Sequence, residues 1–461
     1  MHLAIVGGGS AAFACALKAA EKSQVVLIES DVIGGTCVNV GCVPSKIFIR
    51  TAQMAYWQHQ YPFSGLEKYP IQVDRKKQVF QQQKRVEELR QAKYESLIKE
   101  NPNIQWILGT ATFMDQNTLL IQEKTGNETK LAFDYALIAT GASPSIPPIP
   151  GLQETPYWTS TEALVAKTIP NHLIVIGGSA VGLEIGQAFL HEGARVTVID
   201  VAMLLPKEDP DIGRSLHKIL EEEGMKIFTK TQIQNIKHDG RLFHVELDGL
   251  TLTANHLLVA TGRKPNTESL NLKNIGIKTD SRGAVIIDEF MRTHVENIYA
   301  AGDCTPLPQF VYIAAQAGMR AAINILGGNA KLDLSVMPSV TFTDPQAASV
   351  GITEAEAKQK GIDVEVRVLT LDNVPRALVN FDTRGFIKLV AEKKSRKLLG
   401  TQVLSAEGGE IIQAAAIAIA NQMTVKAISE QLFPYLTMVE GIKLCAQTFF
   451  QDVKQLSCCA G

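Results

Sequence analysis

The stretch HLAIVGGGSAAFACALKAAEKSQVVLIES, residues 2–30, reads as an apolar strand, a glycine turn, a helix of small residues and a second apolar strand. Gly7, Gly9 and Ala12 fit the pattern G-x-G-x-x-A. There the first glycine makes a tight turn, the second lets backbone approach a pyrophosphate, and the third small residue lets helix and strand pack. Glu29 ends the second strand, where an acid accepts hydrogen bonds from an adenosine ribose. The stretch therefore predicts a dinucleotide-binding fold.

The same arrangement returns in HLIVIGGSAVGLEIGQAFLHEGARVTVID, residues 172–200. Gly177 and Gly182 hold the outer positions of the motif, whereas Ser179 replaces the middle glycine. Two copies imply either two dinucleotides or one dinucleotide and a structural copy. Because Asp200 keeps the ribose-binding position, the sequence favours two binding sites.

The identity of the second dinucleotide depends on the residues that follow its acid. A 2′-phosphate requires a basic residue after the second strand. Asp200 is followed by Val201, which favours a free 2′-hydroxyl and NADH, whereas Lys207 is the nearest cation that could support NADPH. Both NADH and NADPH stay open at this point.

Composition sets the class of protein. The 461 residues exceed what one core accommodates and predict about three domains. The net charge of −2 gives no reason to expect nucleic acid or an anionic membrane as partner. Neither a membrane-length apolar run nor a basic signal-peptide head is present, so a cytoplasmic protein is expected.

The segment GGTCVNVGCVPSK, residues 34–46, carries the chemistry. A zinc half-site would need CxxC or HxxxH companions, which the sequence lacks. If a helix begins here, Cys37 and Cys42 come near enough to bridge, so a reversible disulfide is predicted. Cationic Lys46 would favour an anion nearby, such as a thiolate or a reduced flavin.

The other cysteines divide into two groups. Cys15 and Cys445 lie in apolar surroundings and are expected to pack in cores, and Cys304 is expected to be a packed loop thiol. Cys458 and Cys459 stand side by side in the terminal LSCCAG. Adjacent thiols on a terminus are read either as a metal-capturing pair or as a frayed end without a role.

These segments together resemble the flavoprotein disulfide oxidoreductases, the family of glutathione reductase and dihydrolipoamide dehydrogenase. IYAAGDC, residues 298–304, and SVTFTDPQAASVGITEAEA, residues 339–357, extend the resemblance through nearly the whole chain. It implies an α/β homodimer with FAD on the first copy and NADH or NADPH on the second. The expected domains are an FAD-binding domain (1–150, with 269–335 returning to it), an NAD(P)-binding domain (151–268), both Rossmann-like, and an α+β dimerisation domain (336–461).

The resemblance also assigns roles to single residues. Cys42 is expected to face the flavin and Cys37 to be the interchange thiol, while Lys46 and Glu184 form an ion pair beside the flavin ring. The expected cofactor contacts are Gly7, Gly9, Ala12, Glu29, Gly35, Thr36, Lys46, Thr140, Gly141, Gly177, Gly182, Asp200, Gly262 and Asp303, the last near the ribityl and phosphate part of FAD.

One departure from the family pattern narrows the class of substrate that the protein is expected to reduce. Disulfide reductases of this family carry His-Pro-Thr-x-x-Glu near the carboxyl terminus, and its histidine shuttles protons to the leaving thiol. Here the corresponding stretch is YLTMVE, residues 435–440, and no histidine follows His294. Reduction of ordinary disulfides should be crippled, whereas a soft metal ion bound by thiolates needs no such proton shuttle.

FPYLTMVEG and KQLSCCAG resemble the members of this family that reduce mercuric ion. The resemblance implies that Cys458 and Cys459 collect Hg(II) from small thiols or metal-carrier proteins. They would pass the ion to Cys37 and Cys42 of the other subunit by ligand exchange. Two tyrosines, Tyr435 and Tyr94, are expected near the metal. Because the chain starts at the first strand, the core and the tail are expected to supply all the thiols.

Two other functions are weighed against this one. Another disulfide reductase, of the thioredoxin reductase or dihydrolipoamide dehydrogenase type, would keep the missing histidine. A flavoprotein that holds metal without reducing it predicts tight binding and no metal-dependent NAD(P)H oxidation.

Overall fold

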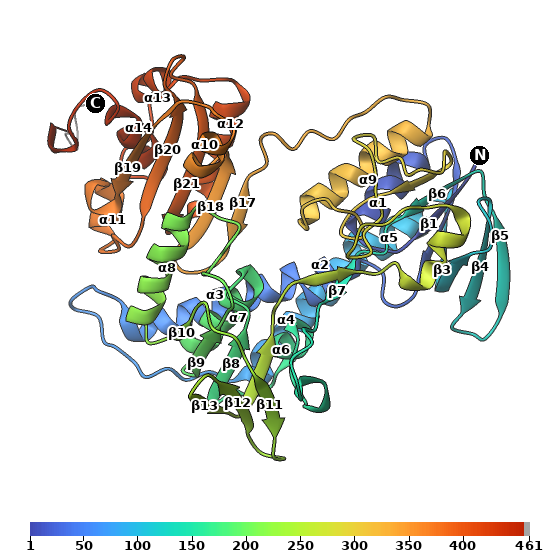
Figure 1. The fold of residues 1–461 in the computed structure, drawn as a ribbon, viewed down its shortest axis with the longest axis horizontal. Coiled ribbons are helices and arrows are strands. Elements are labelled where there is room, and N and C mark those ends of the chain that lie inside the picture. The colour runs from blue at the N-terminus through green and yellow to red at the C-terminus, as the bar shows by residue number, and fades with distance from the viewer. Residues whose placement is uncertain (456–461) are drawn as a thin grey trace.

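The computed structural model describes residues 1–455, so the predicted metal-capturing pair Cys458 and Cys459 lies outside the described residues. Its largest sheet has seven strands in the order β16-β6-β1-β2-β3-β4-β5 (Figure 1). The five strands from β16 to β3 run parallel, and β4 and β5 continue as antiparallel hairpins. These strands are β1 (His2–Val6), β2 (Gln24–Glu29), β3 (Ile104–Phe113), β4 (Thr118–Glu123), β5 (Glu128–Ala132), β6 (Tyr135–Ile138) and β16 (Ile298–Ala300).

A second, four-stranded parallel sheet has the order β10-β9-β8-β14. Beside it lies a small antiparallel sheet, β11-β12-β13. The strands are β8 (His172–Ile176), β9 (Arg195–Ile199), β10 (Lys226–Phe228), β11 (Asn235–His238), β12 (Phe243–Leu247), β13 (Leu250–Ala254) and β14 (His256–Val259).

The two sheets start in the same way, as the repeated motif predicts. Helix α1 (Ser10–Ala19) follows β1, and α7 (Ala180–His191) follows β8. Gly7 and Gly177 have φ of 116° and 112°, and a Cβ there would lie 2.2 Å and 2.4 Å from the carbonyl oxygens of Ala139 and Ala260. Only glycine fits either turn, because both the left-handed backbone and the close neighbouring strand exclude a side chain.

The third sheet is antiparallel, in the order β17-β18-β21-β20-β19. Helices α12, α13 and α14 pack with it around a core that includes Cys445. In Figure 1 this unit occupies the upper left, separate from the seven-stranded sheet on the right. Its elements are β17 (Ser339–Thr341), β18 (Gln346–Gly351), β19 (Val364–Thr370), β20 (Phe386–Glu392), β21 (Leu398–Ser405), α10 (Glu354–Gln359), α11 (Pro375–Val379), α12 (Gly408–Ala420), α13 (Val425–Glu430) and α14 (Glu440–Gln447).

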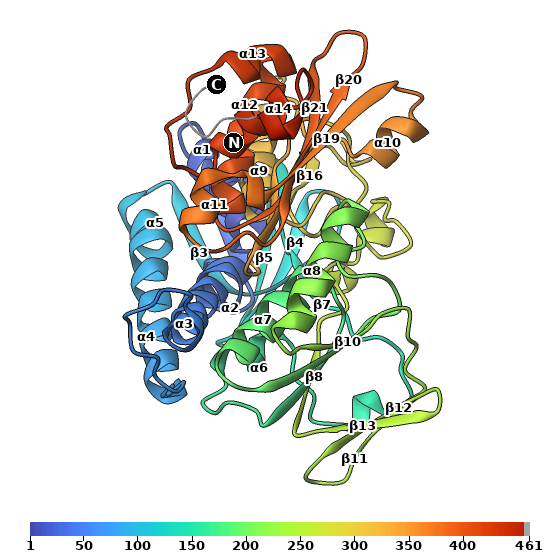
Figure 2. The ribbon, with the colours of Figure 1, turned by 90° about the vertical axis from the view of Figure 1, so that its left-hand side faces the viewer.

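Helices α3 (Cys42–Gln60) and α4 (Arg75–Arg90) lie between β2 and β3 in the chain, and α3 packs against α7 (Figure 2). The rings of Phe48 on α3 and Phe189 on α7 meet edge to face, with centroids 4.9 Å apart. The guanidinium of Arg75 lies 4.2 Å from the centroid of Phe48. The helix that begins at Cys42 is therefore held against the second nucleotide-binding unit.

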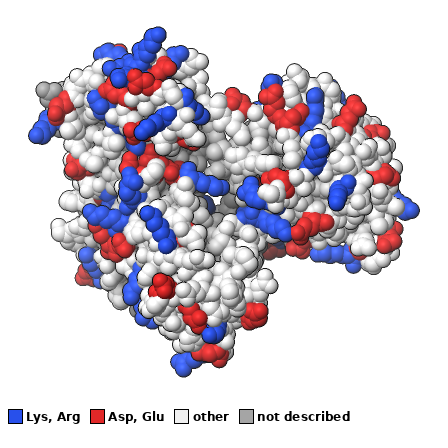
Figure 3. Space-filling view, viewed as in Figure 1, with Lys and Arg blue, Asp and Glu red and all other residues white. Residues whose placement is uncertain are grey.

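Several predictions made from composition can be compared with the structure. Cys15, Cys304 and Cys445 are fully buried, which confirms their expected packing. None of the helices within residues 1–455 is long and apolar enough to cross a membrane. Figure 3 shows acidic and basic side chains interspersed over the visible face, in keeping with the small net charge. The predicted domain boundaries stay predictions.

One arginine ties three parts of the chain together. Arg384 forms ion pairs with Glu223 at 2.7 Å, Asp344 at 3.0 Å and Asp382 at 2.8 Å. Glu223 follows helix α8 (Pro210–Glu222) of the second unit, and Asp344 also accepts hydrogen bonds from Gln53 and Trp57 on α3. Three carboxylates thus share one guanidinium where the units meet.

Replacing Arg384 by methionine should lower the free energy of unfolding by about 3 kcal/mol, because partly buried carboxylates would lose their cation. The midpoint of thermal unfolding of the purified protein measures this. Arg376→Met, at an exposed arginine of α11, serves as the matched control. Equal midpoints for the two variants would contradict the role of Arg384.

Candidate functional site

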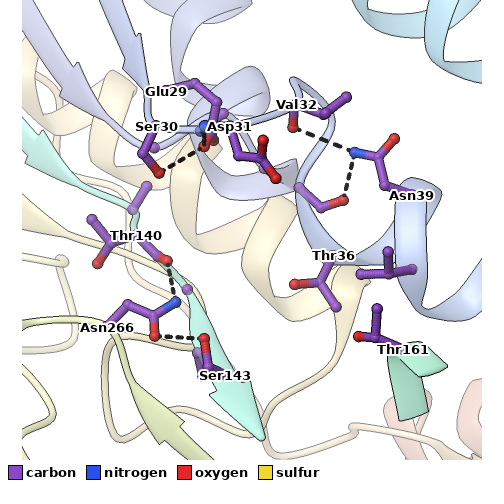
Figure 4. Close-up of a pocket in the computed structure, with 18 of the residues that line it drawn as sticks. Glu29, Ser30, Asp31, Val32, Thr36, Asn39, Thr140, Ser143, Thr161 and Asn266 are labelled. Carbon is purple, nitrogen blue, oxygen red and sulfur yellow. Dashed lines mark hydrogen bonds between the residues drawn. The ribbon is translucent and has the colours of Figure 1, made fainter. Parts of the chain in front are cut away.

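A cleft of about 760 Å³ opens at the carboxyl ends of β1 and β6 (Figure 4). Glu29 lies at one end of it. One carboxylate oxygen of Glu29 accepts a hydrogen bond from the Gly8 N–H at 2.6 Å, and the other accepts one from the Asp31 N–H at 2.9 Å. Seven residues predicted to contact the cofactor line this cleft: Gly7, Gly9, Glu29, Gly35, Thr36, Thr140 and Gly141.

Backbone rather than side chains forms the floor of the cleft. A Cβ on Gly35 would lie 2.6 Å from the Cα of Gly9, and one on Gly8 would lie 2.8 Å from a carboxylate oxygen of Glu29. The amino terminus of α1 follows directly, and helix amino termini favour anions. A bare glycine cradle, a helix amino terminus and a ribose-type acid fit the adenosine and pyrophosphate of FAD.

Two polar residues of the site were not singled out from sequence. Asn266 donates to the Thr140 carbonyl at 3.1 Å and accepts from the Ser143 hydroxyl at 2.8 Å, which fixes the far wall of the cleft (Figure 4). Asn39 donates to the Gly35 carbonyl at 3.0 Å and so holds the glycine turn. Asn39 carries no local signal in the sequence.

Arg263 links the predicted residues Thr36 and Asp303. Its guanidinium bonds the Ala142 carbonyl, lies 3.4 Å from the Thr36 hydroxyl and 4.0 Å from the Asp303 carboxylate. Burial raises the pKa of Asp303, and the charge of Arg263 opposes that rise. Strand β15 (Arg263–Pro265) carries this arginine and pairs with β7 (Ala142–Pro144).

The cysteine segment folds as two helices, not as the start of one. Cys37 lies on α2 (Gly35–Val40), and Cys42 is the first residue of α3. The break falls at Gly41, where a Cβ would lie 2.8 Å from the Thr36 carbonyl oxygen. Both cysteines are partly buried free thiols, and they interact through a side-chain hydrogen bond.

The surroundings of the two thiols move their pKa values in opposite directions. The hydrogen bond from Cys37, with help from the charge of Lys46, lowers the pKa of Cys42 to about 7 although burial opposes it. The same hydrogen bond and burial raise the pKa of Cys37 well above its usual range. Cys42 is thus the more acidic thiol of the pair and is partly ionised at neutral pH.

The predicted ion pair of Lys46 and Glu184 is present. The Lys46 ammonium lies 2.8 Å from one oxygen of Glu184 and 4.5 Å from the centroid of the Phe342 ring. The other oxygen of Glu184 accepts a hydrogen bond from the Phe342 N–H at 2.8 Å. A lysine after the cysteines, an acid on α7 and the chain beyond β17 therefore meet at one point.

The two tyrosines occupy different parts of the chain. Tyr94 lies on a π-helical turn, η1 (Gln91–Glu95), with its ring 4.6 Å from that of Phe13. Burial raises the pKa of its phenol, and the charges of Cys37 and Cys42 add to this rise. A hydrogen bond with Ser10, at the start of α1, lowers the pKa. Tyr435 is half exposed in the segment between α13 and α14, which Figure 1 places away from α2.

The remaining predicted residues outside the first cleft are placed as follows. Ala12 is buried in α1. Gly182 packs α7 against β8, since a Cβ there would lie 2.0 Å from the Gly177 carbonyl oxygen. Gly262 has a φ of 108° at the end of the second sheet. Asp200 accepts hydrogen bonds from backbone N–H groups, as Glu29 does. The second site therefore resembles the first in its backbone.

Family models cover most of the chain. Residues 1–318 match the model described as "Pyridine nucleotide-disulphide oxidoreductase", and residues 337–446 match the dimerisation domain of the same family. A protein called "Mercuric reductase" from Shewanella putrefaciens is 55% identical over 462 residues, which span all of this chain and 83% of that protein. A protein of the same name from Acidithiobacillus ferrooxidans is 54% identical over 463 residues, covering all of this chain and 85% of its own length.

Solved structures agree with the sequence comparisons. The flavoprotein disulfide reductase RclA from Escherichia coli, determined as a Cu(II) complex, is 30% identical with a TM-score of 0.86, covering 95% of this chain and 98% of its own. LpdA from Mycobacterium tuberculosis is 27% identical with a TM-score of 0.88, covering 98% of this chain and all of its own. The resemblance and the α/β fold predicted from the sequence are confirmed, and the chain belongs to the pyridine nucleotide-disulphide oxidoreductase family.

Proposed function

We propose that this protein reduces Hg(II) to Hg(0) with electrons from a reduced nicotinamide dinucleotide. The observation that carries the proposal is a paired thiol and thiolate, Cys37 and Cys42, in a sequence without the histidine that disulfide substrates need. The curated relatives that match the whole chain at 54–55% identity are called mercuric reductases.

The first cleft and the second glycine motif would hold the two dinucleotides. Bound FAD supplies the chemistry that accepts hydride from the nicotinamide and delivers electrons singly or in pairs. Gly8, Gly9 and Gly35 present backbone to the pyrophosphate, and Glu29 accepts from the adenosine ribose. Lys46, held by Glu184, places a cation beside the Cys42 thiolate.

The cysteines are the proposed metal ligands. Soft thiolates are the preferred ligands of soft metal ions. With a pKa of about 7, Cys42 is partly ionised near neutral pH, whereas Cys37 must lose its proton when it binds the metal. Opening a Cys37–Cys42 disulfide takes two electrons, and reduction of Hg(II) to Hg(0) takes two more, so each turnover from reduced thiols consumes one hydride equivalent.

Entry of the metal is assigned to the tail. Cys458 and Cys459 lie outside the described residues, and their role is proposed from sequence alone. In a homodimer, the tail of one subunit would hand Hg(II) to the inner pair of the other by thiol exchange, so that the ion is never released. Tyr435 and Tyr94 are proposed to order the metal on this route.

The proposal is tested anaerobically with the full-length FAD-loaded protein, excess small thiol, and NADH or NADPH in turn. Oxidation of the nicotinamide should depend on Hg(II) and yield volatile Hg(0). Cys42→Ser should lower this rate by more than about a hundredfold, because the thiolate ligand is lost. Cys15→Ala, at a buried cysteine of α1, should retain activity.

Metal bound without nicotinamide oxidation would identify a metal-holding flavoprotein instead. Oxidation driven by glutathione disulfide or lipoamide at a comparable rate would identify a disulfide reductase.

The tail variant Cys458→Ala with Cys459→Ala should lower kcat/KM for thiol-bound Hg(II) by about tenfold or more. Reduction of bound FAD by the nicotinamide should change by less than about twofold, since the tail has no role in that step. Stopped-flow absorbance measures the second quantity and steady-state oxidation the first. Ser457→Ala is the control. Equal loss of both rates would mean that the tail supports the fold.

Alkylation by iodoacetamide should report the acidity of Cys42. In the reduced tail variant the rate should rise with pH around an apparent pKa of about 7, because only the thiolate reacts. Burial raises the pKa of Cys15, Cys304 and Cys445, so those thiols should not be alkylated in this pH range. Cys37→Ala should move the apparent pKa upward, and Lys46→Met should do so to a smaller extent, following the order of their effects on Cys42. An unchanged pH profile in both variants would refute this account.

A further inference from the structure

We infer that the second dinucleotide site selects NADH over NADPH, with Asp200 as the residue that determines this specificity. The inference deepens the proposed function and rests on it only in needing a nicotinamide dinucleotide at the second glycine motif. The two nucleotide sites of this one chain are built alike and support it.

The carboxylates of the two sites are anchored in the same way. Glu29 accepts from the N–H of Gly8, between the two motif glycines, at 2.6 Å and from the N–H of Asp31, two residues after Glu29, at 2.9 Å. Asp200 accepts from Gly178 at 2.5 Å and from Ala202, again two residues onward, at 2.7 Å. The first site is built for the adenosine ribose of FAD, which has a free 2′-hydroxyl. A site of the same construction presents the same acceptor to the second ribose.

The anchored carboxylate cannot turn away from a larger ligand. Each of its oxygens already holds one backbone N–H, and a rotation would break both hydrogen bonds. Leu204 packs beside the same turn, since a Cβ on Gly178 would lie 2.6 Å from Leu204 and 3.4 Å from one oxygen of Asp200. A 2′-phosphate would therefore meet a fixed negative charge at short range, and like charges at such range repel strongly.

Among the described residues 1–455, none of the cations pairs with Asp200 to offset that repulsion. Val201 follows Asp200 and is 73% exposed, in the position where a 2′-phosphate site places a basic residue. Within residues 1–455 neither oxygen of Asp200 bonds a lysine, arginine or histidine. Lys207 and Lys230 are both exposed. The backbone of Lys230 lies beside the turn that follows Asp200, since its N–H donates to the Ala202 carbonyl at 3.2 Å.

Binding to the oxidised, FAD-loaded protein tests the inference without mercury. Isothermal titration should give a dissociation constant for NADP⁺ at least about tenfold above that for NAD⁺, a difference that one fixed like charge readily supplies. Anaerobic stopped-flow reduction of bound FAD should show the same order for NADH and NADPH. Val201→Arg should tighten NADP⁺ binding several-fold, and Val201→Gln is the uncharged control.

Equal or tighter binding of NADP⁺ by the unaltered protein would overturn the inference. If Lys230→Met then weakened the binding of NADP⁺, Lys230 would be the ligand of the 2′-phosphate. Failure to bind either dinucleotide would overturn it as well. If NADH reduced the bound FAD but no turnover depended on Hg(II), the proposed function would be wrong. The preference for NADH over NADPH would still stand.

Discussion

One buried carboxylate holds the site together. Glu184, with 8% of its side chain exposed, sits on α7 of the second sheet and binds Lys46 of α3 and the backbone of Phe342 beyond β17. A buried carboxylate without its cation is costly, so the ion pair fixes α3 to α7. The first residue of α3 is Cys42, and the amino terminus of α7 is the second glycine motif. The thiols and the second dinucleotide site are therefore positioned by the same contact.

Once Glu184 and Lys46 have positioned the two thiols, few further side chains are needed to give Cys37 and Cys42 different pKa values. Cys37 and Cys42 have the same intrinsic acidity, yet the hydrogen bond between them stabilises charge on Cys42 and protonation of Cys37. The break at Gly41 places the two sulfurs on separate helices. A metal ion that binds the thiolate first and displaces one proton from its neighbour needs no further acid or base.

The sequence predicted what local patterns encode. Both strand-glycine-helix units, the ribose acids, the cysteine pair, its lysine and the partner Glu184 were identified by motif or resemblance, and the structure contains their backbone and the ion pair. The roles of Tyr94, Tyr435 and the tail cysteines stay predictions. Features that depend on distant contacts were missed. Arg384 joins carboxylates from separate units, and Asn39 accepts a hydrogen bond from Arg90, 51 positions further along the chain.

The one departure within the repeated motif also has a physical reason. In the first copy the chain returns over the glycine turn, and Gly35 packs backbone to backbone on Gly9, so a side chain has no room at Gly35. In the second copy Ser179 stands at the middle position, and its hydroxyl turns away to donate to the Ala260 carbonyl at 3.2 Å. The serine thus satisfies its own polar atom against β14 and leaves the start of α7 open for a pyrophosphate. A motif that looks weakened in sequence keeps its backbone surface, because the substituted side chain is bonded to the neighbouring strand.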